Sequence, residues 1–356
     1  MTGLRMFFLA LLAALPAFAE APFNAAYVHL HRVALPNDPI EKRLADIDES
    51  IASAKRAGLN IVMPYAADSS GRSYYPGSFR PESLYGEWDA LGAYIAAARS
   101  AGLTVYPAVP MLICGHDAPA GILLKHPEWA LREKDGALGG YISAANPEAR
   151  AWVLGMLQEL VARYHLEGVL LDYLRYPNKP VDLDPVGAVA FAAANPDGKH
   201  AITDRGDTPW QRYKESQLTM LMADIEAALP DTTLALYCWG PHVASGHYVG
   251  QRWADWAKAG YLDIVNVSGY CYTDNYGEKY LEVFRQRLAD ARALVKPEES
   301  DARFTFCLGV LTSHGKIKSA SEIPEYIAAA KEAGIEGVAY FTLNTLKEFT
   351  GTGSPP

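Results

Sequence analysis

The stretch Glu167-Gly168-Val169-Leu170-Leu171-Asp172-Tyr173-Leu174-Arg175-Tyr176-Pro177 decides the fold of the chain around it. After Gly168 come three apolar residues and a single acid, which is the pattern of a short strand buried on both faces. Burying a lone carboxylate is costly unless it is paired or reaches solvent, so we expect Asp172 where the strand opens into a cleft, within reach of Arg175. Pro177 cannot donate to a strand ladder and ends the segment. The stretch therefore predicts a site at the C-terminal end of a strand.

A repeated sequence motif shows how such strands are connected. The sequences of 54–59 (AKRAGL), 98–103 (ARSAGL) and 330–335 (AKEAGI) share one pattern, in which a basic residue and then Gly precede an apolar residue. Basic residues in a last turn followed by Gly are typical of a helix C-terminus with a left-handed cap. The apolar run after each Gly is then the next strand, reached by a very short loop.

Applied along the chain, this rule gives an alternation of strands and helices. Strict alternation with short helix-to-strand turns and long strand-to-helix loops predicts an α/β fold, a single-domain (β/α)8 TIM barrel. Because only residues 343–356 follow the last strand, the eighth helix must be short or missing. We expect strands near 25–31, 60–65, 104–109, 168–172, 233–238, 264–270, 304–310 and 337–342, and helices near 40–57, 88–101, 147–164, 209–229, 251–259, 278–295 and 321–333.

Residues 1–19 have the features of a secretory signal peptide. Arg5 precedes an apolar run, and Ala17-Phe18-Ala19 offers a cleavage site, so residues 20–356 would form the barrel domain. No later segment reaches about 18 uninterrupted apolar residues, so we expect a secreted or periplasmic protein without a membrane anchor after cleavage. The four cysteines are few for this length and lie in apolar runs, which favours buried thiols over a disulfide framework.

Charge and spacing narrow the class of ligand. The formal net charge is -9 and no Lys/Arg run occurs, so a nucleic-acid or polyphosphate partner has no support and a neutral or cationic ligand fits better. His29 and His31 could begin a metal site, but the later strands lack the expected partners, and no Gly-rich phosphate loop follows a strand. We therefore expect no metal and no cofactor.

The long loops all follow strands, and barrel active sites are built from such loops. We expect the loop 173–208 to cover the mouth as a partly mobile lid, because it is long, rich in Pro and Asp, and attached to the strand that carries Asp172. The long loops are 66–87, 110–146, 173–208, 239–250 and 271–277.

Acids just past strand ends could converge over the mouth, as a carboxylate pair for glycosidic cleavage must. They are Asp68, Asp117, Asp172 and Asp274. A loop aspartate can equally form a turn or cap a helix, whereas Asp172 has no cap to make. The same rim is rich in aromatic and histidine side chains, which suit the apolar faces and hydroxyl edges of sugars but can also simply pack. These side chains are His31, Tyr65, His116, Tyr141, Trp239, His242, Tyr270 and Tyr272.

The segment 168–177 resembles the strand-four signature of the bacterial glycosyl hydrolase-like "family 10 glycosylhydrolase" barrels: Gly, apolar run, Asp, aromatic, Arg, aromatic, Pro. His126-Pro127-Glu128-Trp129 and Ala145-Asn146-Pro147-Glu148-Ala149-Arg150 are similar to two further segments of that group. The resemblance implies an exported (β/α)8 glycoside hydrolase with Asp172 as a catalytic acid. It also implies a bacterial or plant polysaccharide as substrate, with an amino-sugar polymer as one candidate.

The second catalytic group is less defined, because Val267-Ser268-Gly269-Tyr270 replaces the Pro-Gln-Ile-Tyr-like run of the group. By position, Asp274 and Asp117 are candidates, and Tyr270 together with the substrate's own acetamide is another. Two functions stay open: a glycosidase, or a catalytically silent barrel that binds glycans in the same cleft. The expected substrate contacts are His31, Tyr65, Asp68, His116, Tyr173, Arg175, Trp239, His242 and Tyr272.

Overall fold

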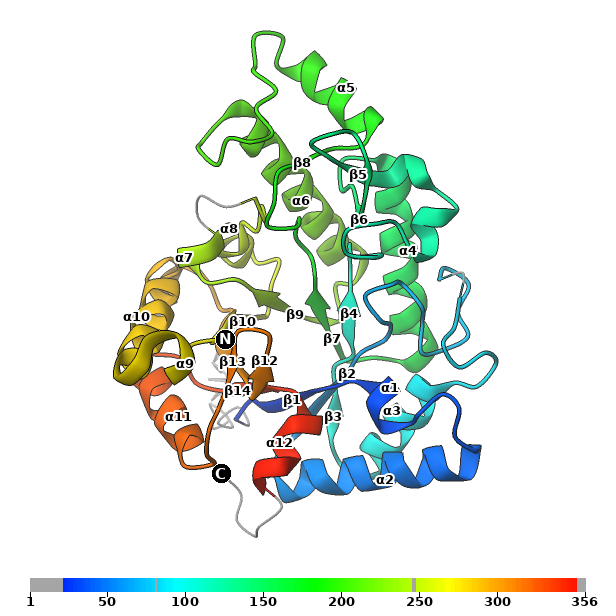
Figure 1. Ribbon diagram of the computed structural model, residues 1–356, viewed down its shortest axis with the longest axis vertical. Coiled ribbons are helices and arrows are strands. Elements are labelled where there is room, and N and C mark those ends of the chain that lie inside the picture. Colours follow the sequence, from blue (N-terminus) through cyan, green and yellow to red (C-terminus); the bar gives the residue numbers. More distant parts are fainter. Residues whose placement is uncertain (1–21, 81, 245–247, 351–356) are drawn as a thin grey trace, which may run out of the picture.

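The computed structural model describes residues 22–80, 82–244 and 248–350, and the signal peptide expected at 1–19 lies outside this part. Its centre is a parallel sheet whose strands pair in the order β3-β2-β1-β14-β11-β10-β9-β7-β4 (Figure 1). The strands are β1 (Asn24–Val28), β2 (Ile61–Pro64), β3 (Thr104–Val105), β4 (Ala108–Pro110), β7 (Gly168–Asp172), β9 (Thr233–Cys238), β10 (Ile264–Ser268), β11 (Arg303–Gly309) and β14 (Val338–Phe341).

The sheet closes on itself through its third strand. We expected one strand over 104–109, but β3 and β4 are two pieces of it, interrupted at Tyr106 and Pro107. Pro107 has no N–H to give to the ladder, although its carbonyl still accepts from the Leu170 N–H. β3 pairs with β2 and β4 pairs with β7, and a parallel bridge from Tyr65 to Ala108 joins the two edges. The predicted (β/α)8 barrel is confirmed.

Helices surround the barrel at the predicted places. The positive φ angles of Gly58, Gly102 and Gly334, 68°, 75° and 74°, are those of left-handed caps after α2, α3 and α11. The last helix, α12, has only eight residues, in agreement with a short eighth helix. The helices are α2 (Ile40–Arg56), α3 (Ala90–Ser100), α4 (Pro147–Tyr164), α6 (Pro209–Ala228), α8 (Trp253–Lys258), α10 (Tyr280–Ala293), α11 (Glu322–Glu332) and α12 (Leu343–Thr350).

Two of the long loops build an outer sheet of their own. β5 (Ala130–Glu133) pairs in antiparallel fashion with both β6 (Leu138–Ile142) and β8 (Val181–Asp182), and α5 (Pro185–Ala194) follows at the end of the molecule remote from β1 (Figure 1). Buried Asp184 ties this unit together: it accepts hydrogen bonds from Ser143 and Asn146 and caps α5. Within the segment expected as a lid, β8 and the start of α5 are therefore held against the loop after β4, whereas Phe191 and His200 pack on Trp210 of α6.

The remaining elements are short and lie between strands and helices. They are α1 (Leu30–Val33), α7 (Pro241–Ala244), α9 (Thr273–Tyr276), the antiparallel pair β12 (Leu311–Thr312) and β13 (Gly315–Lys316), and the 3-10 turns η1 (Gly121–Leu124), η2 (Pro127–Trp129), η3 (Gly277–Lys279) and η4 (Pro297–Glu299).

The interior is apolar and contains thiols rather than disulfides. Cys114, Cys238, Cys271 and Cys307 are all free and buried. In the described ranges, no helix has both the length and the apolar composition to cross a bilayer.

Candidate active site

A cavity of about 590 Å³ opens at the C-terminal ends of the barrel strands. In a parallel barrel these ends, and the loops that leave them, form the functional face. The walls carry tyrosine hydroxyls, two arginines, two histidines and one acid. The lining residues are Tyr27, Tyr65, Asp172, Tyr173, Arg175, Asn178, Tyr237, Trp239, Gly240, His242, Ser268, Tyr270, Asn275, Tyr276, Arg287, Thr312, Ser313, His314 and Phe341.

Asp172 is the last residue of β7, and both of its carboxylate oxygens are held. The Tyr65 hydroxyl donates to Oδ2 at 2.6 Å, and the Tyr173 backbone N–H donates to Oδ1 at 2.8 Å. Tyr173 adopts a φ of 52°, a left-handed conformation that bulky residues rarely take. The chain thus turns sharply at the strand end and fixes the carboxylate where it reaches the cavity.

Burial controls the acidity of Asp172. The residue is only 6% exposed, and this loss of hydration raises the pKa of its carboxyl above the ordinary value for aspartate. The Tyr65 hydroxyl, the Arg175 charge and the Tyr173 N–H each lower the pKa, but burial dominates. The protonated form therefore persists to higher pH than in an exposed aspartate, which suits a proton donor.

Arg175 is clamped by aromatic rings beside Asp172. Its guanidinium lies 4.9 Å from the centre of the Tyr173 ring and 4.6 Å from that of Trp239. It donates to the Tyr176 carbonyl at 3.1 Å, and its Nε is buried without an acceptor in the described structure. No ion pair joins Arg175 to Asp172 within the described ranges, so their interaction acts through space.

Tyrosine hydroxyls form the floor. The Tyr27 hydroxyl accepts a hydrogen bond from Asn266 at 3.1 Å, and the Tyr237 hydroxyl donates to Ser268 at 3.1 Å. Burial raises the pKa of Tyr27, Tyr237 and Tyr270. The three phenols are therefore neutral. The Tyr237 proton is taken up by Ser268, whereas the Tyr27 hydroxyl accepts from Asn266 and keeps its own proton for donation to a ligand.

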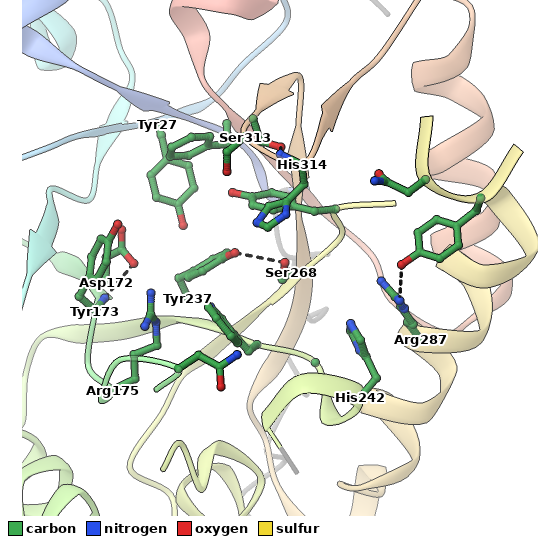
Figure 2. Close-up of a pocket in the computed structure, with 18 of the residues that line it drawn as sticks. Tyr27, Asp172, Tyr173, Arg175, Tyr237, His242, Ser268, Arg287, Ser313 and His314 are labelled. Atoms are coloured by element: carbon green, nitrogen blue, oxygen red, sulfur yellow. Dashed lines mark hydrogen bonds between the residues drawn. The ribbon is translucent and has the colours of Figure 1, made fainter. Parts of the chain in front are cut away.

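The opposite wall is made by α10 and the loops after β9, β10 and β11. Figure 2 shows Asp172 and Arg175 on one side of the cavity and Arg287 on the other, with Tyr237 and Ser268 between them. Arg287 reaches from α10 and donates to the Tyr276 hydroxyl at 2.6 Å. This arrangement gives the cavity a cationic group at each end.

About half of the expected site residues come together here. Asp172, Tyr270, Tyr65, Tyr173, Arg175, Trp239 and His242 line the cavity. The others, His31, Asp68, His116, Asp117, Tyr272 and Asp274, are not among its lining residues. Three of these pair with neutral hydroxyls elsewhere on the rim: His31 with Tyr74, His116 with Ser69, and Tyr272 with Thr312.

The other rim acids are occupied by local partners. Asp274 pairs with Lys318 at 2.7 Å, and Asp117 pairs with Lys179 at 2.8 Å. Asp68 accepts hydrogen bonds from the backbone N–H groups of Ser70 and Arg72, which is a turn-forming role. The expected convergence of acids is not seen: among the described residues, Asp172 is the only acid that lines the cavity.

Several lining residues carried a weak signal in the sequence. Tyr237 and Ser268 lie at or near the last positions of β9 and β10, where a polar group in an apolar run points to the mouth. Tyr27 and Phe341 are indistinguishable from core residues by pattern, and Arg287 lies on an amphipathic helix like any surface arginine. The described part of the chain has no group of three or more His, Cys, Asp or Glu side chains placed to hold a metal ion.

Solved structures share this architecture at low sequence identity. The PgaB (BpsB) glycoside hydrolase domain from Bordetella bronchiseptica is similar with a TM-score of 0.66 and 16% identity, over 92% of this chain and 99% of that chain. Alpha-L-fucosidase isoenzyme 2 from Paenibacillus thiaminolyticus gives 0.61 and 14%, over 93% and 48%. An alpha-amylase from Lactobacillus plantarum gives 0.54 and 12%, over 91% and 71%. At these identities the likeness establishes the fold.

The sequence itself identifies the family. No curated protein matches it. The family model described as "Glycosyl hydrolase-like 10" matches residues 45–293, which is more than half of the chain and includes Asp172, Arg175 and Arg287. The chain therefore belongs to the glycosyl hydrolase-like 10 family.

Proposed function

We propose that this protein is a glycoside hydrolase that protonates the leaving oxygen of a glycosidic bond from Asp172. The observation that carries the proposal is a buried strand-end carboxyl with raised pKa, held by Tyr65 and open to a cavity large enough for sugar rings. Family membership supports a glycan as the ligand. The signal-peptide pattern of residues 1–19 supports action on a bacterial or plant polysaccharide outside the cytoplasm.

The second catalytic group is proposed to come from the substrate. Glycosidases with two carboxylates hold them about 5 to 9.5 Å apart across the bond. No second acid lines this cavity in the described structure, and the one acid outside the described residues is Glu20, next to the expected cleavage site. In a substrate-assisted route, an acetamide oxygen attacks C1 while the C1–O bond breaks and Asp172 gives its proton to the departing oxygen. The neutral hydroxyl of Tyr270, whose partner is the Cys307 sulfur at 3.7 Å, is suited to orient that acetamide.

The same observation favours a second candidate. A cavity with one acid can bind a glycan without cutting it, so a catalytically silent glycan-binding barrel is the alternative. Its ring-bearing walls would serve either role. The two candidates differ in turnover and not in binding.

The test is to incubate the purified mature chain with a panel of polysaccharides, with and without N-acetylated sugars, and to measure new reducing ends. Product masses identify the bond that is cut. Asp172→Asn is the inactive comparison, and Asp290→Asn, an exposed acid on α10, is the matched control. Cleavage of an N-acetylated substrate that Asp172→Asn abolishes supports the proposal. Binding of a glycan by the wild-type chain without any cleavage overturns it in favour of the silent barrel.

A further inference from the structure

The cavity has the opposite charge from the chain that surrounds it. The whole sequence carries a formal net charge of -9. Among the described lining residues, Arg175 and Arg287 are the guanidinium groups and Asp172 is the only carboxylate. The lining is thus net positive whether Asp172 is ionised or protonated. A positive cleft in a low-dielectric wall concentrates field lines and attracts anions.

Arg287 has only neutral partners. Its guanidinium donates to the Tyr276 hydroxyl at 2.6 Å and to the Cys271 sulfur at 3.3 Å, and it lies 4.9 Å from the centre of the Tyr276 ring. No carboxylate pairs with it in the described ranges. Arg285, on the same helix but facing solvent, pairs with Glu332 at 2.9 Å. Glu332 of α11 therefore neutralises the exposed arginine of α10, and the cavity arginine stays available to a ligand.

Arg175 provides a second cation of the same kind. Tyr173 and Trp239 hold its guanidinium in place, and no ion pair joins it to Asp172 in the described structure. A guanidinium fixed between rings loses little freedom when it binds an oxyanion. The two arginines lie at opposite ends of the cavity, with neutral hydroxyls of Tyr237 and Ser268 between them (Figure 2).

We propose that this cavity selects a glycan that carries anionic groups, with Arg287 as the residue that binds one of them away from Asp172. The inference rests on the proposed glycoside hydrolase function and names its substrate class. Carboxylate and sulfate groups both present a pair of anionic oxygens. A guanidinium group can bind such a pair with two parallel hydrogen bonds. A polymer of unsubstituted amino sugars, which is cationic, would be repelled from both ends of the cavity.

The experiment measures binding of four short oligosaccharides of equal length by calorimetry: one with uronate groups, one with sulfate groups, one neutral and one with free amines. Mass spectrometry verifies that each ligand stays intact during the titration. We expect the wild-type chain to bind the uronate or the sulfate ligand at least about tenfold more tightly than the neutral one, since charge-assisted hydrogen bonds exceed neutral ones. The tighter of these two identifies the anionic group.

Arg287→Gln should weaken binding of the preferred anionic ligand roughly 10- to 100-fold and leave binding of the neutral one unchanged. Arg287→Lys keeps the charge and should recover part of the loss. Arg285→Gln removes an arginine from the same helix and should bind all four ligands as the wild type does. Melting temperatures of the variants show whether each one is folded. If Arg287→Gln is unfolded, the affinities of Arg287→Lys for the anionic and the neutral ligand are compared instead.

The results separate this inference from the proposed function. Equal affinity for anionic and neutral ligands, tightest binding of the amine ligand, or an equal effect of Arg287→Gln on all ligands would overturn the anionic preference. If a neutral polysaccharide is nevertheless cleaved, the proposed hydrolase function is supported and the anionic preference is rejected. If anionic glycans bind through Arg287 and none is cut, the preference stands and hydrolysis does not.

Discussion

Asp172 and Asp68 both follow barrel strands, yet their surroundings are opposite. Asp172 ends β7, is buried, and accepts hydrogen bonds from a phenol and from the next backbone N–H. Asp68 lies in the loop after β2, where two backbone N–H groups and the Arg72 guanidinium satisfy it. Asp274, beyond β10, is likewise neutralised by Lys318. Proximity to a strand end is therefore shared by all three.

The difference lies in what remains for a substrate. The carboxylate of Asp68 is used up by its turn, and that of Asp274 is stabilised as an anion by Lys318, which lowers its pKa. A buried carboxyl with hydroxyl and amide partners resists ionisation, and the cavity keeps it accessible. Chemistry is thus expected at the β7 end of the mouth and structure at the other acids, and each experiment below tests that division.

The largest effect is expected from Asp172→Asn. The change removes the transferable proton, so turnover should fall by at least about 100-fold, since general acid catalysis supplies that much. Stability should not fall. The folded-state pKa of Asp172 is raised, so the folded chain binds more protons than the unfolded one between the two pKa values, and the free energy of unfolding drops as pH rises through that window. At neutral pH the Asn variant, which lacks this penalty, should melt at the wild-type temperature or higher.

Rate and melting temperature are measured on one sample. A well-folded variant with near wild-type turnover would remove Asp172 from the chemistry. A turnover loss that merely follows a lower melting temperature would make Asp172 a structural residue like Asp68.

The pH profile of kcat/KM is expected to fall about tenfold per unit on its alkaline side, because Asp172 must be protonated to act as an acid. The midpoint of that limb should lie above the ordinary aspartate pKa, in line with the burial of the side chain. Initial rates across the pH range test this. An activity that rises as pH passes that midpoint would instead make Asp172 a base or nucleophile.

Tyr65→Phe should reduce turnover less than Asp172→Asn does, and it should shift the pH profile of kcat/KM. The Tyr65 hydroxyl lowers the pKa of Asp172 by donating to Oδ2, so its removal should raise that pKa and move the alkaline limb to higher pH. We expect turnover to fall roughly tenfold through lost positioning of the carboxyl. Tyr74→Phe, which removes the hydroxyl bound to His31, is the control, because neither Tyr74 nor His31 is among the lining residues of the cavity. The same profile shift in both variants would show that Tyr65 does not act on Asp172.

The smallest effect is expected from Asp274→Asn. Its carboxylate is exposed and the Lys318 ammonium lowers its pKa, which leaves it a permanent, solvent-screened anion at neutral pH. Turnover and melting temperature should both stay at wild-type values. A turnover loss beyond about tenfold would restore Asp274 as a catalytic group and break the division between the two parts of the mouth.

The sequence was sufficient to predict the barrel, because the repeated pattern of helix, glycine cap and apolar strand depends on local interactions. The glycine caps at Gly58, Gly102 and Gly334 and the apolar runs after them depend only on backbone sterics and burial, so the strands could be placed within a few residues. The break at Pro107 was missed because one proline can end a strand or interrupt it, and pairing with β2 and β7 decides which.

The site was predictable where it lies on a strand and not where it lies on loops. Asp172 stood out as a charge in an apolar run, a signal of local burial. The pairing of Asp274 with Lys318, or of Asp117 with Lys179, depends on how separate loops pack, and no local pattern encodes it. Arg287 reaches the cavity only because α10 lies beside the loop after β10.

The four buried, unpaired cysteines make the folded chain poorly reactive toward thiol reagents. Burial raises the pKa of each thiol, to about 11 for Cys114, so few thiolates are present for alkylation or oxidation. Cys238 and Cys307 lie inside the barrel wall, whereas Cys271 lies at its rim. Labelling of Cys271 ahead of the other two would report opening of the rim alone, and simultaneous labelling would time the opening of the whole barrel. The order in which the native thiols are labelled thus reports the order in which parts of the barrel open, without any added probe.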